Sequence, residues 1–189
     1  MNQQSQALLP ELIGTQNRVF INVVSVIAGS IFLALLAQIA IPVPFSPVPI
    51  TGQTFGVAFL ALTFGSKRGL AAFTLYLLEG LVGLPVFAGA QSGLTVGPTV
   101  GYLIGMFIAS GVVGALADRG LATRVWTAFL CCVIGSAITF TAGLWGLSFF
   151  VPASQLIKVG LIPFLPGDVI KNLLAASLAA SASRALRSR

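Results

Sequence analysis

Few side chains in this sequence could do chemistry, and three charged ones lie in or near apolar segments. Glu79 ends one such segment beside Gly80, and Asp168 and Lys171 lie close together near the start of another. Charges in such surroundings are costly and usually face a cavity or a partner. A carboxylate and an ammonium at one cavity mouth would offer a hydrogen-bond acceptor and a donor to a polar small molecule.

The pair Asp168 and Lys171 also has simpler interpretations. Pro166 and Gly167 predict a helix start, with Asp168 at the cap or in the first turn. Asp168, Lys171 and Asn172 would then share one helix face. The two charges could only neutralise each other there, or Lys171 could extend outward to lipid head groups. As a ligand site, this face makes Asp168, Lys171 and Asn172 candidate contacts, with Glu79 as a further one.

Several kinds of chemistry are disfavoured by the residues present. The chain has no histidine, so a histidine-based hydrolase triad cannot form, and no G-x-x-x-x-G-K-[ST] phosphate loop occurs. Cys131 and Cys132 are adjacent in an apolar run, which favours packing inside a helix over a redox or metal role. We therefore predict no metal, no bound cofactor and no catalytic residue.

The composition indicates an integral membrane protein. Of the 189 residues, 57% are apolar and 7% are charged, whereas globular domains carry about 25% charged residues. So few charges cannot cover a soluble surface of this size. The net charge of +6 could suggest nucleic acid, but its distribution indicates membrane orientation, so we expect a lipid bilayer and no nucleic-acid partner.

An all-α bundle of six transmembrane helices is predicted for residues 19–189, after an N-terminal cytoplasmic segment at 1–18. A span takes about 20 residues, so the short second and third segments should tilt or be helped by loops. Long loops follow the first, third and fifth spans, and residues 155–161 could form an interfacial helix in the last of these. The predicted spans are Val19–Ile41, Ile50–Phe64, Gly69–Leu84, Pro98–Ala117, Val125–Leu147 and Gly167–Ala185.

Basic residues gather on one side of this topology. Six spans leave only Lys158 in the loops of the other side, which is a strong positive-inside signal. It predicts that both termini are cytoplasmic and that the three long loops and Asp168 lie at the outer face. The residues on the inner side are Arg18, Lys67, Arg68, Arg119, Arg124, Arg184, Arg187 and Arg189.

The outer loops and the fourth helix supply weaker candidates. Tyr102 could form an aromatic pocket wall that carries a hydroxyl. It lies beside a stripe of small residues at four-residue spacing, which favours close helix packing. The stripe is Gly97, Gly101, Gly105 and Ala109, and the loop candidates for a lid are Phe45, Thr51, Gln53, Phe87 and Gln91.

Four ordered motifs then resemble one family. They are PITGQT at 49–54, GLPVFAG at 83–89, GPTVGYLIG at 97–105 and PFLPGDVIK at 163–171. In this order and spacing the chain resembles the BioY family, the biotin-binding S-components of energy-coupling factor (ECF) transporters. The resemblance implies a six-helix, non-enzymatic subunit of a prokaryotic cell membrane that captures biotin outside. A transmembrane coupling protein and two cytoplasmic ATPases would drive its delivery inward.

The resemblance also implies roles for particular residues. Asp168 and Lys171 match the family's ligand contacts, and Gln53 and Tyr102 look like pocket positions. Asp168 can accept hydrogen bonds from the ureido N–H groups of biotin, and Lys171 can donate to the ureido carbonyl, while Phe87 and Tyr102 could pack on the thioether ring. S-components often carry two alanines four residues apart on helix one for docking the coupling protein. The matching small pairs in this sequence are Ser25 with Gly29 and Ser30 with Ala34.

Three alternatives remain open at this stage. The chain could be an S-component for another vitamin, such as thiamine or riboflavin. It could be an intramembrane enzyme that uses Glu79 and Asp168 as paired carboxylates. It could also be a purely structural membrane subunit, in which the Asp168–Lys171 pair would be dispensable for binding.

Overall fold

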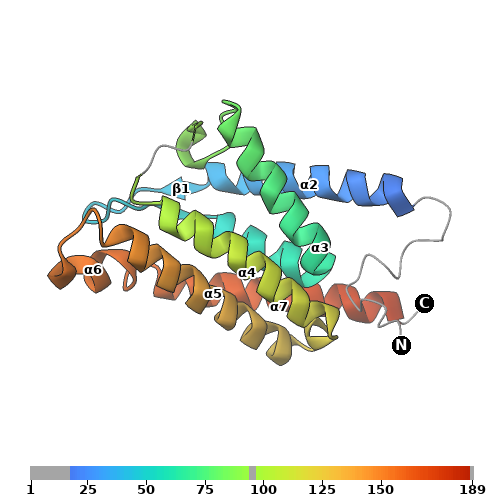
Figure 1. The fold of residues 1–189 in the computed structure, drawn as a ribbon. Coiled ribbons are helices and arrows are strands. Elements are labelled where there is room, and N and C mark those ends of the chain that lie inside the picture. The colour runs from blue at the N-terminus through green and yellow to red at the C-terminus, as the bar shows by residue number, and fades with distance from the viewer. Residues whose placement is uncertain (1–17, 94–96, 188–189) are drawn as a thin grey trace.

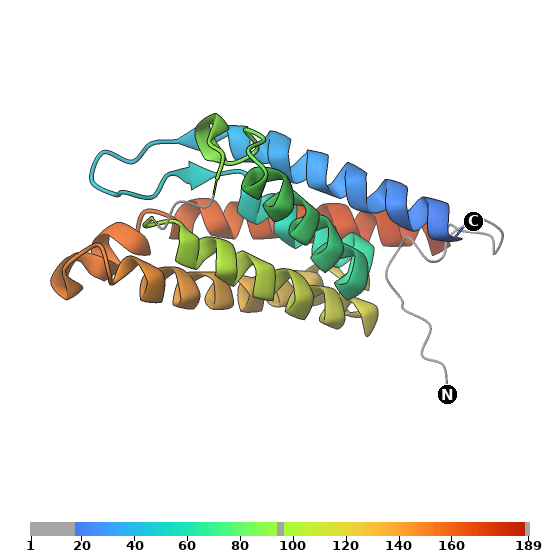
Figure 2. The same cartoon turned by 45° about the horizontal axis from the view of Figure 1, so that its top comes forward.

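Long helices running side by side make up most of the computed structural model, which describes residues 18–93 and 97–187. A two-stranded hairpin and the short helix α6 lie at one end of the bundle, and the C-terminal end of α7 lies at the other (Figures 1 and 2). The six α-helices of the described residues are α2 (Arg18–Gln38), α3 (Gln53–Leu81), α4 (Val100–Asp118), α5 (Val125–Leu147), α6 (Ala153–Gly160) and α7 (Leu165–Arg187).

The second and third predicted spans are the two arms of the single element α3. The chain turns at Gly65, whose φ of 77° and ψ of −177° lie in a region that is essentially restricted to glycine. Gly69 comes to rest against the backbone of Ala61, so the second arm folds back on the first. The predicted gap between the two spans, at residues 65–68, is therefore smaller than expected: only Gly65 departs from helical geometry, and Lys67 and Arg68 belong to the second arm.

The other spans agree with the sequence analysis to within a few residues. α5 has the predicted bounds, and Asp168 lies in the first turn of α7 as expected. α2, α4 and α5 are each long and apolar enough to cross a membrane. α6 and α7, which meet at a bend of 41°, are together long and apolar enough to form one further span. Each arm of α3 is shorter than a full span of about 20 residues.

The loops at the hairpin end have more structure than their proline and glycine content predicts. β1 (Ala40–Ile41) and β2 (Ile50–Thr51) pair antiparallel and close the proline-rich segment into a hairpin. The loop after α3 contains the short 3-10 turn η2 (Ala88–Ala90). Both loops lie near the start of α4 in Figure 2, so chain segments far apart in sequence form one end of the molecule.

The opposite end of the bundle is held by polar contacts around the turn in α3. The Ser66 backbone N–H and hydroxyl both donate to the Asp118 carboxylate, at 3.0 and 2.6 Å. The Arg68 guanidinium donates to the Asn22 side chain at 2.7 Å. These contacts join α2, α3 and α4, and the 3-10 turn η3 (Leu121–Thr123) packs against α4, α5 and α7 beside them.

The small-residue stripe of α4 packs directly on α5, as the sequence predicted. A Cβ added at Gly101 would lie 2.5 Å from the Ala142 carbonyl oxygen, and one at Gly105 would lie 2.7 Å from the Thr139 Cα. Both neighbours are backbone atoms, which cannot move aside as a flexible side chain can. The absence of side chains at these positions therefore sets the distance between the two helices.

We predict that Gly105→Ala destabilises the protein, whereas Gly111→Ala does not. The new methyl group at position 105 would press on the α5 backbone, and overpacking of this kind costs about 1–3 kcal/mol. At position 111 it would meet only the flexible Leu70 side chain, at 3.2 Å. Thermal unfolding in detergent should show a midpoint lower by several degrees for Gly105→Ala only, and equal midpoints would contradict this account of the helix contact.

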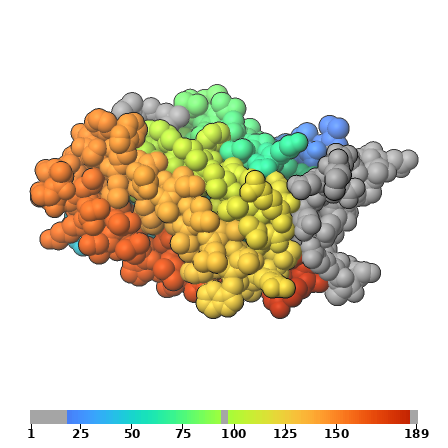
Figure 3. Space-filling model, turned by 60° about the horizontal axis from the view of Figure 1, so that its bottom comes forward, coloured from blue at the N-terminus to red at the C-terminus, as the bar shows by residue number. Residues whose placement is uncertain are grey.

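Exposed apolar side chains cover the outside of the bundle. Phe20, Ile27 and Leu35 project from α2, and the exposed tryptophans Trp126 and Trp145 lie near the two ends of α5. Figure 3 shows the face along which α5 runs, with α6 at one end. Such a surface suits lipid rather than water, in agreement with the predicted all-α membrane fold.

Candidate functional site

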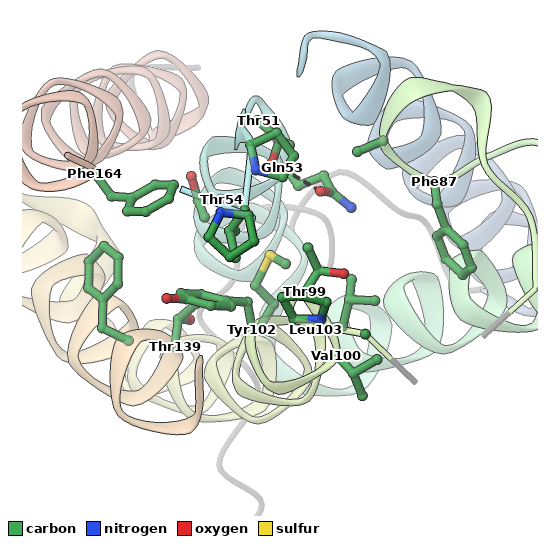
Figure 4. Close-up of a pocket in the computed structure, with 18 of the residues that line it drawn as sticks. Thr51, Gln53, Thr54, Phe87, Thr99, Val100, Tyr102, Leu103, Thr139 and Phe164 are labelled. Carbon is green, nitrogen blue, oxygen red and sulfur yellow. Dashed lines mark hydrogen bonds between the residues drawn. The ribbon is translucent and has the colours of Figure 1, made fainter. Parts of the chain in front are cut away.

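A cavity of about 320 Å³ opens at the hairpin end of the bundle, which is within the usual range for small-molecule sites. It is lined by both loops of that end and by helices α3, α4, α5 and α7, and Figure 4 shows side chains from these elements converging on it. Of the predicted ligand contacts and lid residues, the lining includes Thr51, Gln53, Phe87, Gln91, Tyr102, Asp168 and Lys171.

Lys171 joins α7 to the start of α3 at the cavity wall. Its ammonium donates to the Thr51 carbonyl oxygen at 2.6 Å and to the Thr54 hydroxyl at 3.2 Å, across about 120 positions of sequence. Asp168 and Lys171 form no ion pair, although both lie in the described part of the chain. The two charges therefore compensate each other only across a distance, and the ammonium points toward the cavity wall rather than toward lipid.

The side-chain amide of Asn172, one turn further along α7, holds the Asp168 carboxylate. The Asn172 Nδ2 donates to Asp168 Oδ2 at 2.9 Å and to Ser136 Oγ at 2.8 Å, which ties α7 to α5. Asn172 does not line the main cavity. It lines, with Asp168, an adjoining cavity of about 20 Å³, which is room for about one water molecule. Asn172 is therefore placed to orient Asp168 rather than to contact a ligand in the main cavity.

A chain of contacts fixes the polar group of Gln53, beside the Thr51 and Thr54 groups that Lys171 contacts. Gln53 accepts a hydrogen bond from the Thr51 hydroxyl at 3.0 Å and donates to the Tyr76 hydroxyl at 2.6 Å. The Tyr76 ring meets the Phe87 ring edge to face at 5.4 Å. Phe87 reaches this position because Gly80 has no side chain: a Cβ there would lie 2.1 Å from the Phe87 ring.

Aromatic rings form the side of the cavity nearest α6. The Tyr102 hydroxyl donates to the Gly160 carbonyl oxygen at 2.7 Å, and its ring lies against the bare α-carbon of Gly143. The Phe164 ring lies 6.2 Å from Tyr102 and 6.4 Å from Phe140. The site thus combines apolar walls with a few fixed polar groups, which is the composition expected where a compact, polar-ended ligand binds.

Comparison with known proteins gives the family. A family model described as BioY matches residues 6–188. A biotin transporter BioY of Thermotoga maritima is 39% identical over 157 residues, which are 81% of this chain and 92% of that protein. The biotin transporter BioY2 of Lactococcus lactis subsp. cremoris is 33% identical over 178 residues, covering 90% and 94% of the two chains. The chain belongs to the BioY family.

A solved structure supports the same fold. The crystal structure of the S-component for biotin from an ECF-type ABC transporter matches with a TM-score of 0.82 and 26% sequence identity, covering 94% of this chain and 96% of that one. The six-helix S-component bundle predicted for this BioY protein is therefore confirmed.

Glu79 lies outside the cavity of this BioY protein. Its carboxylate accepts a hydrogen bond from the buried Ser30 hydroxyl between α2 and α3, and it lines neither cavity. The structure argues against the predicted ligand contact at Glu79, and also against an enzyme that pairs Glu79 with Asp168. Phe45 also lies off the cavity, with its side chain exposed on the hairpin.

The residues predicted to dock a coupling protein mostly face inward. Ser25, Gly29 and Ser30 are buried, and Gly29 lies against Ala72 and Phe64 of α3. Only Ala34 is partly accessible. Because a partner cannot reach buried positions while α2 packs on α3, the docking prediction is corrected for Ser25, Gly29 and Ser30, which pack within the chain.

Several lining residues were missed by the sequence analysis. The threonines have no charge and no distinctive spacing, although Thr54 and Thr99 fall inside the motifs quoted above. Phe164 also stands within a quoted motif, next to the prolines before α7. Thr139, Phe140 and Met106 sit in apolar helices where nothing in the sequence marks the cavity-facing positions. The missed lining residues include Thr54, Thr99, Met106, Thr139, Phe140 and Phe164.

Proposed function

We propose that this protein is the biotin-binding S-component of an ECF transporter, with the cavity beside Asp168 and Lys171 as its binding site. The observation that carries the proposal is the pairing of a carboxylate and an ammonium, not bonded to each other, at one apolar cavity. This proposal is supported by family membership and by the biotin transporters among the relatives.

The chemistry of the cavity suits biotin. Its ureido group has two N–H donors and one carbonyl acceptor, so it needs both an acceptor and a donor from the protein. Asp168 would accept from the N–H groups and Lys171 would donate to the carbonyl, with Gln53 as a further polar contact. Tyr102 and Phe87 would pack against the apolar thioether ring. Gln91 lines the cavity from the loop after α3.

We further propose that the cavity faces the cell exterior and that both termini are cytoplasmic, in the cell membrane of a prokaryote. The basic residues Lys67, Arg68, Arg119 and Arg124 lie at the turn of α3 and around η3, away from the cavity, which supports this orientation. Trp126 and Trp145 lie on α5, and the helical rise of about 1.5 Å per residue separates them by about 28 Å along the helix axis. This spacing is close to the hydrocarbon thickness of about 30 Å and is typical of two interface belts.

The energy for uptake would come from partners. The proposed partners are a transmembrane coupling protein and two cytoplasmic ATPases, as the resemblance to the family implies. The matching S-component comes from an ECF-type ABC transporter, which supports an energised assembly. The chain itself would act without catalysis. A partner would meet the exposed apolar side chains of the bundle rather than the buried residues Ser25, Gly29 and Ser30 of α2.

The proposal is tested by calorimetry on the purified protein in detergent, after any co-purified ligand has been removed. We expect tight binding of biotin, with no heat of binding from thiamine or riboflavin. Tight binding of either of those vitamins in place of biotin would contradict the ligand assignment. No binding of any of the three would contradict the role of the cavity as a vitamin site.

A further inference from the structure

The last residue of α2, Gln38, makes an unusual set of contacts with the loop that follows α3. Its Nε2 donates to the Val86 and Phe87 carbonyl oxygens, at 3.3 and 3.2 Å, and to the Ala34 carbonyl of its own helix at 3.0 Å. Its Oε1 accepts from the Ala90 N–H at 2.9 Å. The loop lies against this end of α2 in both ribbon views (Figures 1 and 2).

Apart from the buried Phe87 ring, which packs in the core with Tyr76, the loop segment 86–91 has few contacts that hold its backbone. η2 contains no buried residue, and Ala90 has a φ of 57°, the only positive φ outside glycine among residues 18–93 and 97–187. Such a conformation is costly for alanine unless neighbouring contacts support it. Beyond Gln38, the backbone hydrogen bonds of this segment are local: Val86 N–H donates to the Leu84 carbonyl at 2.8 Å and Phe87 N–H to the Gln91 carbonyl at 3.0 Å. Just after the segment, Gly93 N–H donates to the Gly80 carbonyl at 2.8 Å.

The same segment carries part of the cavity wall. Phe87, Ala88 and Gln91 all line the cavity, whereas Gln38 does not. The Phe87 ring fits the space over Gly80 and rests on Tyr76. The position of this wall therefore depends on where the loop backbone is held, and the Gln38 amide is the group that holds it to α2.

We propose that Gln38 is a positioning residue that controls how long the ligand stays bound, by holding segment 86–91 closed over the cavity. The inference rests on the proposed function, since it concerns the same site. Gln38 is exposed, so the loop groups that lose it can bond to water instead, and the fold should survive its removal. What changes is the fraction of time for which the Phe87 wall is open.

The test compares Gln38→Ala with Gln155→Ala in the purified full-length protein. Gln155 is an exposed glutamine on α6 at the same end of the molecule, and its side chain makes no hydrogen bond within the described residues. Dissociation of labelled biotin, chased by excess unlabelled biotin, should be faster by roughly tenfold in Gln38→Ala, because several hydrogen bonds that hold the loop to α2 are lost together. Gln155→Ala should dissociate at the wild-type rate, and both should unfold at the wild-type temperature.

Two further measurements separate positioning from general weakening. In ligand-free protein, amide hydrogen exchange in segment 86–91 should be faster in Gln38→Ala and unchanged in Gln155→Ala. In a double-mutant cycle, adding Gln38→Ala to Phe87→Ala should change the dissociation rate little, because the wall that Gln38 holds is already removed. Additive effects of the two substitutions would overturn the proposal.

Other outcomes also decide the question. An unchanged dissociation rate in Gln38→Ala would overturn the proposal, whether or not exchange in the loop became faster. If the wild-type protein bound no biotin, the proposed function would fail and the retention role would fail with it. Loop exchange in ligand-free Gln38→Ala would then still show separately whether the amide holds segment 86–91.

Discussion

Replacing Asp168 with asparagine should weaken biotin binding about tenfold or more. A hydrogen bond to a charged group contributes roughly 1.5–3 kcal/mol, and about 1.4 kcal/mol corresponds to tenfold in affinity. The asparagine keeps the shape of the side chain, and its carbonyl oxygen can still accept from Asn172, which donates to Asp168 at 2.9 Å. The loss should therefore appear in binding, measured by calorimetry, and only slightly in thermal stability.

Glu79→Gln is the matched control for this substitution. It removes a carboxylate that is bonded to Ser30 away from the cavity, so biotin affinity should stay within about twofold of wild type. Wild-type affinity in Asp168→Asn would leave the family assignment intact but remove Asp168 from the site. Equal losses in the two variants would show that the loss of either carboxylate weakens binding, and would contradict a local role for Asp168.

Replacing Lys171 with methionine should weaken binding by roughly tenfold to a hundredfold, because two effects act together. The ligand loses a charged donor, and the buried Asp168 carboxylate loses the nearby positive charge that partly compensates it. The Thr51 carbonyl and the Thr54 hydroxyl also lose the ammonium that ties α7 to the start of α3. Calorimetry should show the loss of affinity, and thermal unfolding should show a lower midpoint than in Asp168→Asn.

Lys158→Met provides the comparison for charge alone. Lys158 is an exposed lysine on α6 at the same end of the protein, and it makes no hydrogen bond within the described residues. Its removal should leave biotin affinity unchanged. A similar loss in Lys158→Met and Lys171→Met would mean that the general positive potential of this end attracts the ligand, and that the position of the Lys171 ammonium is unimportant.

Local features of the fold could be predicted from particular residues. The apolar run of α5 is bounded by Arg124 and by the polar residue Ser148, so the sequence predicted both ends of this helix correctly. Pro166 and Gly167 located the start of α7 closely enough to put Asp168 in its first turn. The stripe of small residues on α4 predicted a close helix contact, since four-residue spacing places glycines on one helix face whatever the partner helix is.

The turn in α3 was harder to predict. Lys67 and Arg68 resemble a loop between two helices. Yet the chain turns at Gly65, and this one residue is the only non-helical position within α3. Ser66 and Asp118 supply the polar partners that the turn needs. Those partners are about 52 positions apart, so no local pattern could reveal them.

The direction in which helix faces point was also decided by packing. In a soluble helix, polar and apolar residues mark the outer and inner faces, but both faces of α2 are apolar. For that reason the small residues Ser25, Gly29 and Ser30 fitted an external docking surface as well as an internal contact, and the structure places them inside. For the same reason, the sequence could not show which way Glu79 points. In the structure its carboxylate faces Ser30 rather than the cavity.

By itself, the sequence determined the membrane character, the helical class, the family resemblance and most of the charged and aromatic residues of the site, because composition, spacing and short motifs act locally along the chain. Only the tertiary structure decided which of those residues share a cavity. Lys171 meets Thr51, Phe87 fits over Gly80, and Gln38 holds the loop after α3 through contacts between distant segments. Such contacts depend on how the helices pack against one another, and that packing is set by the shapes of many small side chains together.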